Sequence, residues 1–282
     1  MTKFKTIILS SLLMLLFSGC VSQSGDSRPV IAVTILPQQY FTGKIAGRGY
    51  AITVLVPPGA SAETYTPSPS QMRSMAKASV WLRIGQVDFE TGWADKIRQN
   101  CPALKIFDTS AQADWLHGSH EHGSVDPHIW MAPDEVKKIA VETCRALSET
   151  FPADKTLFEH NLAAFQVEID LLDRQLQSII SKTVKHSFLI FHPALGYFAR
   201  RYGLEQIPME LDGKEPSPRR LRELIDMARD SALHTVFIQK EFDVKNARQL
   251  ADEIGGRVEI IDPLAEKWNE QLIIIANKIA GQ

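Results

Sequence analysis

The feature that most constrains the fold is a long amphipathic segment, residues 153–184, which interrupts an alternating series of short apolar runs and helical patterns. Its large apolar residues recur at alternating spacings of three and four, the period of one helix face. They are Leu162, Phe165, Ile169, Leu172, Leu176 and Ile179. At 1.5 Å per residue, about thirty residues extend roughly 45 Å, enough to run along two lobes and join them. A two-stranded coiled coil is the less favoured alternative, because the pattern is short and has no surrounding repeat.

The chain on either side of this segment predicts two lobes. Apolar runs that read as strands lie at 30–35, 51–56, 80–85, 104–108, 188–192, 235–239 and 258–262. Strands that alternate with helices form mainly parallel sheets with both faces covered. We therefore predict an α/β fold, with a mainly parallel sheet flanked by helices in each lobe and one long helix joining the lobes. The expected parts are an N-terminal lobe at 29–152, a linking helix at 153–184 and a C-terminal lobe at 185–282.

The first residues predict export. Lys3 and Lys5 precede an apolar run at 7–17, which is too short to span a bilayer comfortably and has the layout of a signal peptide. The residues that follow, "FSGC", resemble the lipobox of bacterial lipoproteins, whose cysteine is lipidated. We expect a signal peptide at 1–19 and a lipidated tether at 20–28, with Cys20 anchoring an extracytoplasmic protein to the bacterial membrane. The alternative is an ordinary signal peptide that contains a chance cysteine.

The charge balance and the few cysteines argue against nucleic-acid binding and against a thiolate metal site. Lys and Arg number 31 against 33 Asp and Glu, so no nucleic-acid groove is expected. Besides Cys20, the chain has only Cys101 and Cys144, which could form a disulfide in an oxidising compartment or remain free. Neither has a CxxC partner, so a thiolate metal site is not expected.

Four side chains that can coordinate a metal follow predicted strands, the place where ligands bind in open α/β sheets. They are Glu63 in "LVPPGASAETY", His128 in "DPHIW", His192 in "FLIFHPA" and Asp262 in "VEIIDPL". Three of the four adjoin a proline, which restricts the local backbone and aims the side chain. One such histidine alone is more often structural than a ligand. Two candidates from each half of the chain together predict a metal ion between the lobes.

A second group of histidines lies in the segment "HGSHEHGS", residues 117–124. His117, His120 and His122 have no flanking proline and no strand that delivers them, so we expect a solvated loop. Such a loop binds metal weakly, as an auxiliary collecting or sensing site, or has no metal role at all. Of the neighbouring histidines, His128 is the one that we expect the tight metal site to include.

The chain resembles the solute-binding lipoproteins of zinc and manganese ABC importers, the ZnuA/TroA-like family, over nearly all of residues 29–282. The resemblance rests on six motifs in the family's order and spacing. They are "ILPQQYF", "LVPPGASAETYTPSPSQM", "DPHIWMAP", "FHPALGYFARRYGL", "GKEPSPRRL" and "IDPL". It implies a protein that captures a divalent metal ion between two metal-binding lobes and delivers it to an ABC transporter membrane permease.

The resemblance also implies one ligand from each of four motifs. His128, His192 and Asp262 match the family pattern, whereas Glu63 stands where the family usually has a histidine. Glu63 and Asp262 would balance the charge of a divalent ion, and carboxylate oxygen favours Mn(II) or Fe(II) more than imidazole does. In contrast, His192 stands where manganese-type members usually carry a carboxylate, and His-rich loops are common in zinc members. We therefore expect Zn(II), with Mn(II) or Fe(II) as the alternative.

Two other kinds of function compete with metal transport. In a zinc-dependent hydrolase, three residues would hold the metal and Glu63 would act as general base. The sequence has neither HExxH nor GxSxG, and four ligands would leave no open position for water, so we expect no enzyme. A surface adhesin is the other possibility and would be compatible with metal binding. We expect the protein to be a monomer.

Overall fold

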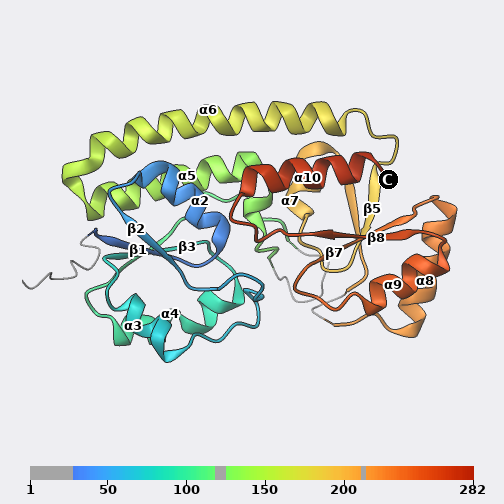
Figure 1. Cartoon of the computed structure of the whole chain (residues 1–282), viewed down its shortest axis with the longest axis horizontal. Coiled ribbons are helices and arrows are strands. Elements are labelled where there is room, and N and C mark those ends of the chain that lie inside the picture. The colour runs from blue at the N-terminus through green and yellow to red at the C-terminus, as the bar shows by residue number, and fades with distance from the viewer. Residues whose placement is uncertain (1–27, 118–124, 211–213) are drawn as a thin grey trace, which may run out of the picture.

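The computed structural model describes residues 28–117, 125–210 and 214–282, and within these residues it contains two four-stranded parallel sheets. The N-terminal sheet has the order β2-β1-β3-β4, with β1 Val30–Val33, β2 Ala51–Val54, β3 Val80–Arg83 and β4 Lys105–Asp108. The C-terminal sheet has the order β6-β5-β7-β8, with β5 Ser187–Ile190, β6 Glu205–Pro208, β7 Thr235–Gln239 and β8 Arg257–Ile261. The predicted two-lobe α/β architecture is confirmed (Figure 1).

Strand β6 was not predicted from the sequence. It pairs in parallel with β5 at the edge of the C-terminal sheet, with Pro208 opposite Ile190. Its sequence is the short, polar "EQIP", and Glu205 is exposed. Proline and polar residues are tolerated in an edge strand, because one side of its backbone needs no partner. A short edge strand therefore lacks the apolar run by which the buried strands are recognised.

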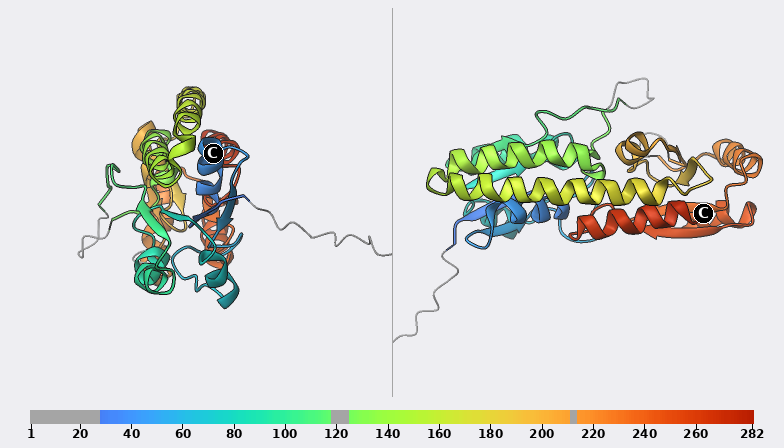
Figure 2. Two further views of the ribbon diagram at one scale, coloured as in Figure 1. Left: turned by 90° about the vertical axis from the view of Figure 1, so that its left-hand side faces the viewer. Right: turned by 90° about the horizontal axis from the view of Figure 1, so that it is seen from above.

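The predicted long helix is α6, Lys155–Ile180. It runs along the top of both lobes in Figure 1, and the view from above in Figure 2 places it between α5 (Pro133–Thr150) and α10 (Trp268–Ala280). Most of the predicted stripe is buried, and Leu162 and Ile179 at its margins are partly buried. Residues 152–154 form a separate 3-10 turn before the helix, so the helix is shorter than the predicted segment.

The remaining helices cover the faces of the two sheets (Figure 1). In the N-terminal lobe, α2 Leu36–Ala46 lies on the same side as α5, and α3 Pro69–Met75 and α4 Asp88–Asn100 lie on the opposite side. The C-terminal lobe contributes α7 Gly196–Tyr202, α8 Pro218–Asp230 and α9 Lys245–Glu253. Ser217 caps α8 by accepting a hydrogen bond from the backbone N–H of Arg220, as its Ser-Pro start predicts.

The larger hydrophobic core continues from one lobe into the other. It joins Phe41 of α2 to Phe237 of β7 and to Trp268 at the start of α10. Two buried indoles form hydrogen bonds across the same boundary. Trp130 donates from Nε1 to the carbonyl of Pro263 at 2.9 Å, and Trp268 donates from Nε1 to the carbonyl of Trp130 at 2.6 Å. The lobes are therefore packed together, so the strand ends that face each other have a defined relative position.

Cys101 and Cys144 are both buried and free, so they form no disulfide with each other. Burial raises the pKa of both thiols. Among the helices in the described part of the chain, none has the length and apolar character needed to cross a membrane. The predicted signal peptide and Cys20 lie outside the described residues.

Candidate metal centre

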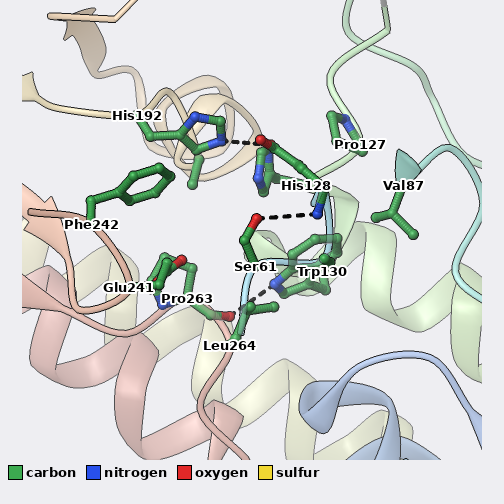
Figure 3. Close-up of a pocket in the computed structure, with 13 residues that line it drawn as sticks. Ser61, Val87, Pro127, His128, Trp130, His192, Glu241, Phe242, Pro263 and Leu264 are labelled. Carbon is green, nitrogen blue, oxygen red and sulfur yellow. Dashed lines mark hydrogen bonds and ion pairs between the residues drawn. The ribbon is translucent and has the colours of Figure 1, made fainter. Parts of the chain in front are cut away.

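Three of the predicted ligands converge where the two lobes meet. Glu63, His128 and His192 each offer one ligand atom, and these atoms all lie within 4.8 Å of one another. Glu63 and His128 come from loops of the N-terminal lobe, whereas His192 follows β5 in the C-terminal lobe. Figure 3 shows His128 and His192 on the wall of the same pocket. The arrangement gives two imidazole nitrogens and one carboxylate, a donor set suited to zinc.

His192 is held by contacts on several sides. Its Nδ1 lies 3.0 Å from Oε2 of the buried Glu210, and its backbone carbonyl accepts a hydrogen bond from Nε2 of Gln239 at 2.6 Å. The ring of Phe242 stacks on the imidazole with centroids 5.3 Å apart. With Nδ1 engaged by Glu210, Nε2 is the atom directed at the pocket, where it lies 3.0 Å from Oε1 of Glu63. A carboxylate on the far nitrogen orients a metal-binding histidine and raises its basicity.

His128 has the same kind of support. Oδ1 of Asp126 accepts a hydrogen bond from the backbone N–H of His128 at 2.9 Å and lies 2.8 Å from Nδ1 of its ring. Nε2 is therefore the nitrogen left for a metal. The His128 ring lies 5.2 Å from the His192 ring between centroids, so the two imidazoles face one site.

Glu63 is delivered by the turn that follows β2. The backbone N–H of Glu63 donates to Oγ of Ser61 at 3.2 Å, and the N–H of Phe89 at the start of α4 donates to the carbonyl of Ala62 at 3.0 Å. These bonds attach the loop to the N-terminal lobe. The Glu63 side chain is 30% exposed and those of His128 and His192 are 11% exposed, so Glu63 lies nearest to solvent.

The charges of the site are coupled. Burial would lower the pKa of His192, but its hydrogen bonds with Glu210 and Glu63, and the charges of both, raise that pKa to about 10. Burial on its own would raise the pKa of Glu63. The hydrogen bond with His192 and the charges of His192 and His128 outweigh burial and lower the pKa of Glu63. His192 is therefore protonated and Glu63 ionised at neutral pH. A metal ion that binds here replaces the proton on Nε2 of His192.

The pocket around these residues is small and suits an ion. It offers about 30 Å³ to the centre of a water-sized sphere, more than the roughly 10–15 Å³ that one water molecule needs. Besides the three candidate ligands, its walls include Ser61, Val87, Trp130, Glu241, Phe242 and Leu264, several of which are labelled in Figure 3.

The structure does not bring Asp262, the fourth predicted ligand, into this group. Its Oδ2 forms an ion pair with Nζ of Lys240, and its Oδ1 accepts a hydrogen bond from the N–H of Leu264 at 3.2 Å. Pro263 and Leu264 line the pocket, but Asp262 does not. Only one of the three predicted auxiliary histidines lies within the described residues. His117 is exposed and forms an isolated antiparallel bridge with Val125, whereas His120 and His122 lie outside the described residues.

Three carboxylates near the site were not predicted from the sequence. Asp126 could have been found two residues before His128 in "DPH", and Glu210 could have been found by searching just beyond a strand end, had β6 been recognised. The third is Glu241, two residues beyond the end of β7, which lines the pocket. Burial and the charge of Asp262 raise the pKa of Glu241.

Comparisons with known proteins identify the kind of protein that carries this site. Residues 31–275 match the family model described as "Zinc-uptake complex component A periplasmic". The chain is 26% identical over 282 residues to the zinc-binding lipoprotein AdcA of Streptococcus pneumoniae, with 94% of the chain aligned to 56% of that relative. The chain therefore spans little more than half of the length of AdcA. It is 24% identical over 263 residues to the high-affinity zinc uptake system protein ZnuA of Bacillus subtilis, covering 87% of the chain and 81% of that relative.

A solved structure supports the same relationship. The crystal structure of a ZnuA superposes on the chain with a TM-score of 0.87 at 38% identity, covering 90% of the chain and 98% of that structure. A match over nine-tenths of the chain extends into both lobes of the fold.

Proposed function

Because the chain belongs to the family of the periplasmic zinc-uptake complex component A, we propose that Glu63, His128 and His192 hold one Zn(II) ion between its lobes. The chain is a zinc-binding solute receptor of ABC-type uptake. The observation that carries the proposal is the convergence, within 4.8 Å, of ligand atoms from both lobes. Zinc in closed sites takes four ligands, so the C-terminal lobe supplies one more, for which Asp262 and Glu241 are the nearby carboxylates.

The same proposal covers the partners of the protein. It works as a monomer, attached to the membrane through lipid on Cys20, and releases zinc to the permease of an ABC importer. A closed four-ligand shell leaves no open position for an activated water, which supports transport over zinc-dependent catalysis. The predicted lobes at 29–152 and 185–282 then each provide part of one binding site.

Metal content and competition test the choice of zinc. Protein purified without chelator is expected to contain about one zinc per chain by elemental analysis. Zn(II) is expected to displace Mn(II) when the two compete, because imidazole nitrogen favours zinc and the Irving–Williams order places zinc above manganese. Retention of manganese against an equal concentration of zinc would show that the oxygen ligands dominate and would overturn the choice of metal.

Replacing Glu63 with histidine is expected to make zinc binding more sensitive to acid. In the parent, Glu63 stays ionised between pH 7 and pH 5, because its pKa is lowered, so it has no proton to lose when zinc binds. The Glu63→His variant adds a third imidazole, with a reference pKa of ~6.5, that must lose its proton before zinc binds. Zinc affinity of the variant should therefore fall by up to about one further decade per pH unit below pH 6.5.

The measurement is zinc titration by chelator competition at several pH values. Glu63→Gln serves as the control, since it removes the carboxylate without adding a titrating imidazole. If the affinity of Glu63→His falls no more steeply than that of the parent, Glu63 does not coordinate the metal.

We expect the auxiliary histidines to bind zinc independently of the tight site. Replacing His117, His120 and His122 with serine is expected to remove any second, weaker zinc equivalent in calorimetry. The tight site should keep its affinity within about threefold, a change of ~0.7 kcal/mol. The exposed position of His117 outside the pocket supports this expectation. Loss of tight binding in the triple variant would mean that the loop, and not His128, supplies the ligand.

A further inference from the structure

We propose that Gly196 and Tyr197, at the start of α7, are positioning residues for the metal site. They fix the carboxylate of Asp126, and this carboxylate orients the imidazole of His128. This role rests on the proposed function and extends it to a helix of the C-terminal lobe that supplies none of the three candidate ligands. A ligand of the N-terminal lobe is therefore held in place by residues of the other lobe.

The phenol of Tyr197 joins two backbone positions on either side of the histidine-rich segment. Tyr197 is fully buried, and its hydroxyl donates a hydrogen bond to the carbonyl of Asp126 at 3.0 Å. The same hydroxyl accepts a hydrogen bond from the backbone N–H of Leu116 at 2.9 Å. Leu116 and Asp126 also bond directly, since the N–H of Asp126 donates to the carbonyl of Leu116 at 2.8 Å. One buried hydroxyl thus fixes the backbone that carries the Asp126 carboxylate.

The missing side chain of Gly196 leaves room for the Asp126 carboxylate. A Cβ atom on residue 196 would lie 2.4 Å from Oδ2 of Asp126, closer than such atoms approach in proteins. The other oxygen, Oδ1, lies 2.9 Å from the backbone nitrogen of His128 and 2.8 Å from Nδ1 of its ring. Both oxygens belong to one planar group, so a displacement of Oδ2 also moves Oδ1. The orientation of a metal-binding imidazole depends on such a partner.

Helix α7 is a firm support because it is anchored on two sides. The phenol of Tyr202 donates to Oδ1 of Asp173 on α6 at 2.9 Å. Toward the N-terminal lobe, Arg200 pairs with the buried Glu135 of α5 at 3.0 Å. The helix also packs against the 3-10 turn Ile129–Met131, which immediately follows the imidazole ligand of the N-terminal lobe. The start of the helix is therefore a fixed surface for the segment that precedes this ligand.

Tyr197→Phe tests the hydroxyl, and Tyr202→Phe is its matched control. Both tyrosines are buried on α7, and each variant removes a phenol that donates a hydrogen bond, but the partner of Tyr202 lies on α6. Zinc affinity of the full mature protein is measured by competition with a chromophoric chelator, and the stability of the metal-free protein by unfolding in urea. We expect Tyr197→Phe to weaken zinc binding about tenfold and Tyr202→Phe to stay within about twofold, although both variants lose stability.

Gly196→Ala separates the side-chain contact from stability. The added methyl group displaces the Asp126 carboxylate, so zinc binding should weaken about tenfold. Alanine favours a helix more than glycine does, so a general weakening of the helix is not the expected cause. Gly92→Ala on α4 is the control, because outside that helix no described residue has an atom within 4 Å of the added methyl group. Its zinc affinity should match that of the parent.

A double-mutant cycle tests whether Tyr197 acts through Asp126. In an Asp126→Ala background, Tyr197→Phe should still reduce stability but should weaken zinc binding by less than about twofold further. Additive losses of zinc affinity would overturn the inference, as would equal losses in Tyr197→Phe and Tyr202→Phe.

Failure of this inference can be told apart from failure of the proposed site. If Tyr197→Phe and Gly196→Ala bind zinc like the parent while His192→Ala does not, only the positioning role is wrong. If His192→Ala also binds zinc like the parent, the proposed site itself fails and the positioning role fails with it.

Discussion

Replacing His192 with alanine is expected to lower zinc affinity by more than about a hundredfold, or ~2.7 kcal/mol. Loss of a residue that only supports a ligand already costs tenfold to a hundredfold, and His192 is proposed to donate to the metal itself. The variant removes the only imidazole that the C-terminal lobe contributes to the group of three candidate ligands. Chelator competition at fixed pH measures the change.

His160→Ala is the matched control, because His160 is exposed on α6 and does not line the pocket. Its zinc titration should coincide with that of the parent. The His192 variant also leaves Glu210 without its imidazole partner, so its folding must be checked by unfolding in the presence of a chelator. Equal titration curves for the two folded variants would contradict the assignment of the site.

Replacing Trp268 with alanine is expected to destabilise the whole protein by about 3–5 kcal/mol. Trp268 is 2% exposed, packs edge-on against Phe41 with centroids 5.1 Å apart, and donates a hydrogen bond to the carbonyl of Trp130. The variant would leave a cavity in the core that both lobes share and would remove the donor for a buried carbonyl. Equilibrium unfolding in urea measures the loss.

Trp93→Ala provides the comparison, because Trp93 is only half-buried on α4. The free energy of unfolding should fall clearly less in Trp93→Ala than in Trp268→Ala. Trp268→Phe separates the two contributions, since it keeps most of the apolar contact and loses only the hydrogen bond, worth about 1–3 kcal/mol when the carbonyl stays buried. A cost of Trp268→Ala no greater than that of Trp93→Ala would show that the lobes do not depend on this shared core.

Periodicity sufficed to predict the parts of the fold that bury continuous apolar surface. The stripe on α6 repeats every three to four residues, and strands such as β3 and β7 are apolar runs, because each must cover a core. Edge strand β6 escaped detection because it is short and only one of its side chains, Ile207, is buried, which leaves almost no apolar pattern.

The candidate ligands could also be predicted, because they follow the apolar runs that predict strands, and side chains at strand ends are presented to a binding site. Glu63, His128 and His192 were found in this way. Their support by Asp126 and Glu210 could not be found, since a hydrogen bond between residues as far apart as 192 and 210 depends on how two strands pair.

The amino-acid sequence alone thus determined the two-lobe α/β class, the linking helix and three of the residues that meet at the candidate metal centre, because each depends on local periodicity or on a strand and its adjoining turn. Only the tertiary structure decided how the lobes are held together and which carboxylates face the pocket. The indole of Trp268 donates a hydrogen bond to the carbonyl of Trp130, 138 residues away, and Glu241 lines the pocket, whereas Asp262 forms an ion pair with Lys240. The physical reason is that ion pairs and shared cores form between segments distant in sequence, and their geometry exists only after both sheets have packed.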